Sequence, residues 1–436
     1  MKKQIYYQIL TRLWGDGRFS SFTPASLQFL KSFGVDTVWY TGIPRHASGG
    51  DFVKGDPGSP YAVHDWKDVN PYFVAPGEDA LGGFDALVRR THDAGLKVCI
   101  DYIPNHVSRD YRGPIPHYDW CDGDWTDTLK VDWTRPDTLK EMTEVVKFWA
   151  RRGVDAFRCD MVELVDSGLL GRLIAEVKSE FPGVQFVAEV YGKQNYDRYL
   201  AAGFDFLYDK SGSYDILRAI FECGRSAREL TGNWQWLAHR QERMLNFLEN
   251  HDEQRLRHWT GGKPYWAAVA FSMLFNNAPY MIYFGQEAGE DAAEGAQGRT
   301  SIFNWSKPVH AGAIAAYAAS GDIEALNEEE QAIFLRYKEL LSHAHEDTFC
   351  CGRVWDLCYC QQQSGGGFNP DVHFAFLRYT PDGKARAVFC NFSPEKTTVR
   401  LTVPEEPGLL ECGVRPCTLQ ISAAPRDFAI ISLDNI

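Results

Sequence analysis

The feature that most constrains the fold is an alternation of short β-rich segments with longer helical stretches, from the N-terminus to about residue 340. Amphipathic helix patterns at 24–33, 84–94, 138–152 and 167–181 separate several of these segments, and 327–343 is expected to be the last barrel helix. The segments with the length and apolar content of buried strands are 4–10, 36–41, 97–102, 154–159, 184–188, 204–208, 245–248 and 280–284. Such alternation predicts a parallel sheet, and eight units predict an α/β fold of the (β/α)8 TIM barrel type.

The pattern changes near residue 345 and predicts a second domain. Residues 1–344 are expected to form the barrel, and residues 345–436, with period-two alternation and turns, an all-β sandwich. Long connections at 43–60 and 107–131 interrupt the barrel pattern, the second as a short excursion after strand three. Long loops at strand ends usually shape a binding site.

Composition narrows the chemical classes of ligand and partner that this chain can bind. The chain has 45 basic and 58 acidic residues, a net charge of -13, which argues against nucleic acid or an anionic membrane as partner. Its 13 Trp and 20 Tyr suit a neutral ligand with hydroxyl groups. The apolar stretch 265–284 is interrupted by polar residues and proline, so a buried helix followed by a strand is expected there rather than a membrane span.

The N-terminus and the cysteines predict a cytoplasmic protein. The chain as given starts without the apolar stretch and small-residue cleavage site of a secretory signal. Its eleven cysteines, an odd number, suit reduced thiols better than a disulfide framework. The spacing of Cys350, Cys351, Cys358 and Cys360 matches no usual zinc finger or ribbon, and buried or edge-strand thiols are the favoured interpretation.

Four short segments with acids, histidines or an arginine lie at the ends of predicted strands: 101–106, 158–160, 187–189 and 250–252. They are far apart in the chain, but a barrel places the carboxyl ends of its strands on one face. The fold therefore predicts that the four segments assemble one site.

Arg158 and Asp160 share one face of their strand because strand side chains alternate with period two. A carboxylate beside a fixed guanidinium has its ionised form favoured, as a nucleophile requires. Asp160 is therefore the candidate nucleophile. A buried ion pair that only holds the barrel together is an equally good interpretation of this motif alone.

The other segments supply further acids. Glu189 ends an apolar strand, an environment that keeps a proton available for a leaving oxygen. Asp252, in the Asn-His-Asp segment, is a third acid with a hydrogen-bonding neighbour. Taken singly, each could be a strand-end carboxyl, a helix cap or a loop contact. Together, two carboxyls on opposite sides of a glycosidic bond are what retaining glycoside hydrolysis needs.

At these residues the chain resembles the α-amylase family, glycoside hydrolase family 13, whose members act on α-glucosidic bonds. The likeness lies in Asp101 to His106, in Arg158 and Asp160 with Ala156 at the family's Gly, in Glu189 and in Asn250 to Asp252. The resemblance implies that Asp160 is the nucleophile, Glu189 the general acid and base, and Asp252 a third catalytic acid. The substrate-binding residues that it implies or that we add as candidates are Tyr61, Asp101, His106, Arg158, Tyr191, His251 and Arg299. For Arg299, a surface ion pair is the competing interpretation.

The chain also departs from its family. Typical α-amylases carry a Lys-His pair after the nucleophile that helps bind the leaving side and a calcium ion, whereas this chain has Met161-Val-Glu163-Leu164. Asn105 and Asp132 stand where family calcium ligands occur, and their oxygens suit calcium. The resemblance thus allows a bound Ca2+, while no cofactor is required for the chemistry.

Three functions remain open. The first is a retaining α-glucan hydrolase that cuts α-1,4 bonds in starch, glycogen or maltooligosaccharides. The second is a glucanotransferase, an α-glucosidase or an α-1,6-acting enzyme on the same barrel. The third is a non-catalytic relative that binds carbohydrate, against which the intact Asp160, Glu189 and Asp252 argue.

Overall fold

The computed structural model describes residues 2–361 and 366–434. Within them an eight-stranded parallel sheet has the order β11-β10-β9-β8-β5-β2-β1-β12. Its strands are β1 (Ile5–Leu10), β2 (Thr37–Thr41), β5 (Lys97–Tyr102), β8 (Ala156–Cys159), β9 (Gln185–Ala188), β10 (Phe206–Tyr208), β11 (Met244–Leu245) and β12 (Tyr280–Tyr283). A parallel bridge between Asn246 and Tyr280 joins the two ends of the sheet, so the sheet closes into the predicted barrel.

The barrel interior is a packed core. Each strand contributes a buried side chain to it, and these are Tyr6, Trp39, Cys99, Ala156, Val187, Phe206, Leu245 and Met281. Period-two alternation sends neighbouring residues outward against the helices. Burying one large apolar side chain stabilises the fold by about 1.5 to 3 kcal/mol. The strands are therefore held rigidly, and so are the residues at their carboxyl ends.

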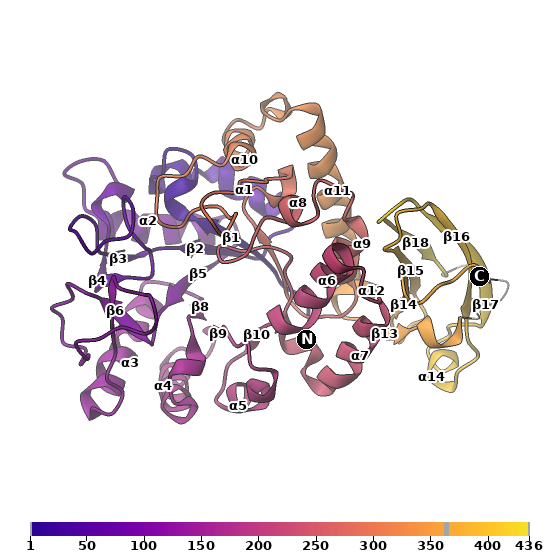
Figure 1. Ribbon diagram of the computed structural model, residues 1–436, viewed down its shortest axis with the longest axis horizontal. Helices are drawn as coiled ribbons and strands as arrows, with labels where there is room; N and C mark the ends of the chain where they lie inside the picture. Colours follow the sequence, from indigo (N-terminus) through magenta and orange to yellow (C-terminus); the bar gives the residue numbers. More distant parts are fainter. Residues whose placement is uncertain (1, 362–365, 435–436) are drawn as a thin grey trace.

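Helices surround the barrel (Figure 1). They are α1 (Pro24–Phe33), α2 (Ala80–Asp93), α3 (Pro136–Arg151), α4 (Ser167–Glu180), α5 (Tyr196–Ala201), α6 (Asp215–Cys223), α7 (Arg228–Leu237), α8 (Leu256–Trp259), α9 (Trp266–Leu274), α10 (Val309–Ser320), α11 (Glu328–Ala344) and α12 (Asp347–Cys350). Local sequence sets their ends: Thr23 caps α1 by accepting a hydrogen bond from the Ser26 amide at 3.1 Å, and Gly34 ends it with φ 105°.

The two long connections carry short strands that their sequences did not predict. The first, 43–60, contains β3 (Pro44–His46), which pairs antiparallel with β4 (Val63–Val69) just beyond it. The second contains β6 (His106–Ser108) and β7 (Thr128–Lys130). The three-residue strands β3, β6 and β7 are too short to show an alternating pattern. Both connections are therefore ordered by strand pairing beside the ends of the barrel strands.

The C-terminal strands form a lobe beside the barrel, drawn in orange to yellow in Figure 1. They are β13 (Arg353–Asp356), β14 (His373–Tyr379), β15 (Ala385–Asn391) and β18 (Phe428–Ser432) in one antiparallel sheet, and β16 (Thr397–Val403) with β17 (Cys417–Ala423) in another, near α14 (Pro407–Leu410). Leu377, Phe389, Leu401 and Ile421 belong to the apolar core of this lobe. The predicted all-β fold is confirmed. In the part of the chain that the structure describes, no helix is long and apolar enough to cross a membrane.

Candidate functional site

A cavity of about 380 Å³ opens at the carboxyl ends of the barrel strands. Asp160 directly follows β8, Glu189 directly follows β9, and Asp252 lies in the loop after β11. The residues predicted from sequence that line the cavity are Tyr61, His106, Asp160, Glu189, Tyr191, His251, Asp252 and Arg299. The two others, Asp101 and Arg158, are buried. The structure thus brings the four separate segments together.

The Arg158 guanidinium lies at the centre of the acids. Its side chain is 0% exposed, and its Nη1 atom contacts Asp160 Oδ1. Its Nη2 atom lies 2.8 Å from Glu189 Oε1 and 3.8 Å from Asp252 Oδ2. Asp101 Oδ1 lies 3.7 Å from Nη1. One buried cation therefore faces four carboxyl groups and fixes their relative positions.

The acids differ in how their surroundings affect ionisation. Burial raises the pKa of Asp160, and the charges of Glu189 and Asp252 add to this, while Arg158 opposes it. The attraction from Arg158 expected from sequence is present, but burial outweighs it. For Asp252, burial is outweighed by His251, Arg158 and Arg299, so its pKa is lowered. Ionisation of Asp160 therefore depends on Arg158, whereas the surroundings of Asp252 favour its ionised form.

Both oxygens of Glu189 are held by neighbours. The Tyr191 hydroxyl donates to Oε1 at 2.7 Å, and the Met161 backbone N–H donates to Oε2 at 2.8 Å. Met161 has φ 42°, a left-handed conformation that non-glycine residues rarely adopt. Residues in such conformations cluster at active sites. The backbone after Asp160 thus orients the second carboxyl.

His251 connects the third acid to the cavity wall. Its Nε2 lies 2.9 Å from Asp252 Oδ2 and 2.6 Å from the Tyr61 hydroxyl. Its Nδ1 lies 2.8 Å from Gln8 Nε2. The rings of Tyr61 and His251 are stacked with centroids 5.1 Å apart. Asp252 is therefore fixed from one side, and Arg299 Nη1 contacts its Oδ1 at 3.3 Å from the other.

The remaining predicted residues support the cavity floor and wall. Asp101 accepts hydrogen bonds from Trp39 Nε1 at 3.1 Å and from the Tyr61 hydroxyl at 3.3 Å. Burial lowers the pKa of His106 to about 4, so its ring is neutral near neutral pH and can both donate and accept a hydrogen bond. Its ring lies 5.3 Å from that of Trp125. A neutral imidazole suits an uncharged ligand with hydroxyls.

Sequence reasoning missed several cavity residues in the loops. Lys54 and Asp127 line the cavity, and 3.5 Å separates the Lys54 ammonium from Asp127 Oδ1. This ion pair joins the two long connections across the site. Glu253 and Phe303 also line the cavity. Their segments have no periodicity, so the only available signal was the length of the loops themselves.

The candidate calcium ligands are engaged with other groups. The Asn105 side-chain oxygen accepts from the Lys130 ammonium. The Asp132 carboxylate accepts from the Tyr118 hydroxyl at 2.9 Å and from the Thr134 amide at 3.0 Å. Asp132 therefore shapes the loop before α3.

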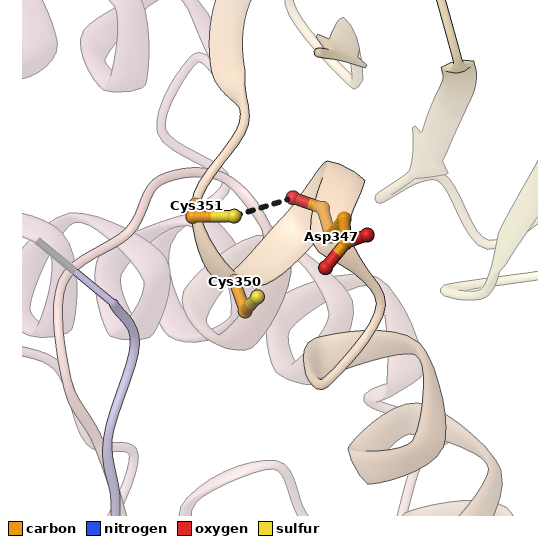
Figure 2. Close-up of side chains that lie close together, drawn as sticks. All are labelled: Asp347, Cys350 and Cys351. Carbon is orange, nitrogen blue, oxygen red and sulfur yellow. Dashed lines mark hydrogen bonds between the residues drawn. The ribbon is translucent and has the colours of Figure 1, made fainter. Parts of the chain in front are cut away.

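The C-terminal cysteines Cys350, Cys351 and Cys358 do not form one cluster. Figure 2 shows Cys350 and Cys351 beside Asp347 on α12, with the Cys351 thiol bonded to the Asp347 carbonyl at 3.3 Å. The two sulfurs and a carboxylate oxygen lie within 4.8 Å of one another. Cys358 is not part of this group, and its thiol contacts the Ala375 carbonyl of β14 at 3.5 Å. Three ligand atoms are fewer than the four of a structural zinc site.

Comparisons with known proteins point in one direction. A family model described as the alpha amylase catalytic domain matches residues 23–125. Alpha-amylase 3 of Dictyoglomus thermophilum is 23% identical over 404 residues, covering 78% of this chain and 76% of that protein. Neopullulanase 2 of Thermoactinomyces vulgaris is 23% identical over 419 residues, covering 88% of this chain and 64% of that protein. The crystal structure of an alpha-amylase from Lactobacillus plantarum superposes with a TM-score of 0.74 at 20% identity, covering 98% of each chain.

Proposed function

We propose that this chain is a member of the α-amylase family of glycoside hydrolases and a retaining hydrolase of α-1,4-linked glucans such as starch, glycogen or maltooligosaccharides. The observation that carries this proposal is the contact of the single Arg158 guanidinium with both Asp160 and Glu189. One guanidinium that touches both groups keeps them close together. Retaining enzymes hold their two carboxyl groups about 5 to 5.5 Å apart, whereas inverting enzymes need about 6.5 to 9.5 Å.

The proposed reaction is a double displacement. Asp160 attacks the anomeric carbon while Glu189 protonates the leaving oxygen, which gives a covalent glycosyl-enzyme. Glu189, now ionised, then takes a proton from water, and that water displaces Asp160. The hydrogen bonds from Tyr191 and Met161 to Glu189 support this role, because a proton donor must be held at a fixed position. Every step uses side chains of this protein alone.

The other cavity residues are proposed to hold the sugar. Asp252 accepts hydrogen bonds from sugar hydroxyls, and its lowered pKa keeps it ionised for that purpose. The neutral ring of His106 binds a further hydroxyl, and the His251 ring holds Asp252 and Tyr61 in place beside the sugar. Tyr61 offers an aromatic face, on which an apolar sugar face gains dispersion and burial. Arg299 reaches the site through Asp252, which favours a binding role over a surface ion pair.

Substrate choice is the part of the proposal that needs a product survey. The purified protein should be given starch, pullulan, maltooligosaccharides, sucrose and trehalose, and the products separated by chromatography. We expect shorter maltooligosaccharides from starch and from maltooligosaccharides. Exclusive formation of elongated products would assign a glucanotransferase, cleavage of pullulan at α-1,6 bonds alone would assign that linkage, and absence of any turnover would leave a non-catalytic carbohydrate-binding relative.

The stereochemistry of the first product tests the double displacement. Because each of two displacements inverts the anomeric carbon, the freshly released reducing end should be the α anomer. Proton NMR during the first minutes of maltooligosaccharide cleavage should show the α signal first and the β signal only as mutarotation proceeds. Initial appearance of the β anomer would rule out a covalent intermediate.

A further inference from the structure

Oxygen atoms from separate loops enclose the ammonium of a lysine beside the catalytic site. Lys130, the last residue of β7, contacts the side-chain oxygen of Asn105. Its Nζ also lies 3.0 Å from Asp122 Oδ2 and 3.4 Å from the Leu164 backbone carbonyl. An ammonium has three N–H donors, so these oxygens can satisfy all of them. The lysine side chain is only 14% exposed.

The three oxygens connect the excursion to two loops of the barrel. Asn105 follows β5, Asp122 belongs to the excursion, and Leu164 follows the nucleophile Asp160. The register of β6 against β7 pairs Lys130 with His106, which places the lysine next to Asn105. Asn105 Nδ2 donates to Asp122 Oδ2 at 2.8 Å and completes the cluster.

We propose that Lys130 is a built-in cation that takes the place of the calcium ion expected from the family resemblance. The donor set present does not fit calcium, which takes six to eight oxygen ligands. The cluster offers one carboxylate, and its Oδ2 atom already binds the ammonium. A divalent cation beside this fixed positive charge would be repelled. The excursion is therefore held against the barrel without a metal.

Thermal unfolding tests this proposal independently of activity. The Tm of the wild-type protein should be the same in EDTA and in millimolar CaCl2. Lys130→Met, which keeps the side-chain length and removes the charge, should lower Tm by about 3 to 6 °C. Lys140→Met is the matched control, because Lys140 is an exposed lysine on α3, and its Tm should be unchanged. A wild-type Tm that falls in EDTA and recovers with Ca2+, or a Lys130→Met protein that melts like wild type, would overturn the proposal.

A second variant examines the cation position itself. Lys130→Asp puts a carboxylate next to Asp122 and should create a need for an added cation. Its Tm is expected to rise by about 3 °C or more in millimolar CaCl2, because a ligand that binds only the folded state stabilises it. If the Tm of this variant does not change with Ca2+, the three oxygens do not form a cation site.

A separate set of contacts gives Glu163 a role. Its carboxylate accepts hydrogen bonds from the Tyr191 amide at 2.8 Å, the Gly192 amide at 3.1 Å and the Asn195 Nδ2 atom at 2.6 Å. The approach is so close that a Cβ atom at Gly192 would lie 2.6 Å from Glu163 Oε1. Tyr191, at the start of this loop, donates its hydroxyl to Glu189. The Glu163 side chain therefore holds this loop.

We infer that Glu163 is a positioning residue for the general acid Glu189, an inference that rests on the proposed function. It fixes the loop that carries Tyr191, and Tyr191 in turn holds Oε1 of the Glu189 carboxyl. Glu189 donates its proton in the first displacement, when the leaving oxygen departs. A substrate with a leaving group that needs no proton, such as α-maltosyl fluoride, should bypass this proton donation.

The two substrate types separate positioning from structural damage. Glu163→Ala should lower kcat on maltooligosaccharides about 30-fold with little change in KM, since general acid catalysis contributes about 10²- to 10⁴-fold. Its rate of fluoride release in a single turnover of α-maltosyl fluoride, which reports the first displacement alone, should stay within about threefold of wild type, because fluoride departs without a proton donor. Glu163→Gln, which keeps one acceptor oxygen, should recover part of the loss. Glu176→Ala, an exposed glutamate on α4, is the control and should match wild type on both substrates.

The outcomes distinguish the two levels of inference. Equal losses in kcat on maltooligosaccharides and in the single-turnover rate of fluoride release would mean that Glu163 only supports the fold, and no loss in either would mean that it does not act on Glu189; both results contradict the inference. A wild-type protein inactive on both substrates would instead contradict the proposed function on which the inference rests.

Discussion

Asp160→Asn is expected to lower kcat on maltooligosaccharides by about 10⁴-fold or more, because the amide cannot attack the anomeric carbon. The substitution keeps the shape of the side chain and its contact with Arg158. Burial opposes ionisation of Asp160, so a neutral amide in its place should leave the fold at least as stable. Initial rates and thermal unfolding of the same preparation would check both statements.

The control for this variant is Asp119→Asn. Asp119 is exposed in the excursion after β5 and lies outside the cavity lining. Its kcat should equal that of wild type. If Asp160→Asn keeps activity within about tenfold of wild type, Asp160 cannot be the nucleophile, and the Arg158–Asp160 pair would be structural.

Glu189→Gln is expected to lower kcat on maltooligosaccharides about 10³-fold, since the amide neither donates a proton to the leaving oxygen nor activates water. The contacts from Tyr191 and Met161 identify the carboxyl that is lost. With α-maltosyl fluoride the first displacement needs no acid, so one equivalent of fluoride should appear rapidly before turnover slows. A fluoride-selective electrode measures this burst.

Comparison of the two substrates decides the assignment of Glu189. The absence of a burst, with a loss on the fluoride as large as on maltooligosaccharides, would show that Glu189 is needed for the first displacement itself. Turnover near the wild-type rate on maltooligosaccharides would remove Glu189 from the reaction.

The sequence was most informative where side chains are buried. Seven of the eight predicted strand segments contain a barrel strand and the eighth overlaps one, because inward residues such as Trp39 and Val187 must be apolar in a closed barrel. The 245–248 segment was the least accurate, since the strand there is only Met244–Leu245 and begins one residue earlier. Asp160 and Glu189 could be located because each directly follows such a strand, whereas Asp252 lies farther along the loop after β11.

Residues that act from loops were harder to predict. Arg299 was undecided from sequence, because a loop has no period that says which way a side chain points. Lys130 and Glu163 were missed as contacts, since each bonds to residues 25 or more positions away in the chain. The sequence did show that Met161 to Leu164 differs from the family pattern. In the structure, Glu163 holds the loop that carries Tyr191, and the Leu164 carbonyl faces the Lys130 ammonium.

Trapping the covalent intermediate tests the central claim most directly. In Glu189→Gln treated with α-maltosyl fluoride, the first displacement should proceed while hydrolysis of the glycosyl-enzyme is slow, so the adduct should accumulate. Mass spectrometry of the intact protein should show one added maltosyl group, and peptide mapping should place it on Asp160. A maltosyl group on another residue, or complete release of fluoride with no adduct at any time point, would contradict a double displacement through Asp160.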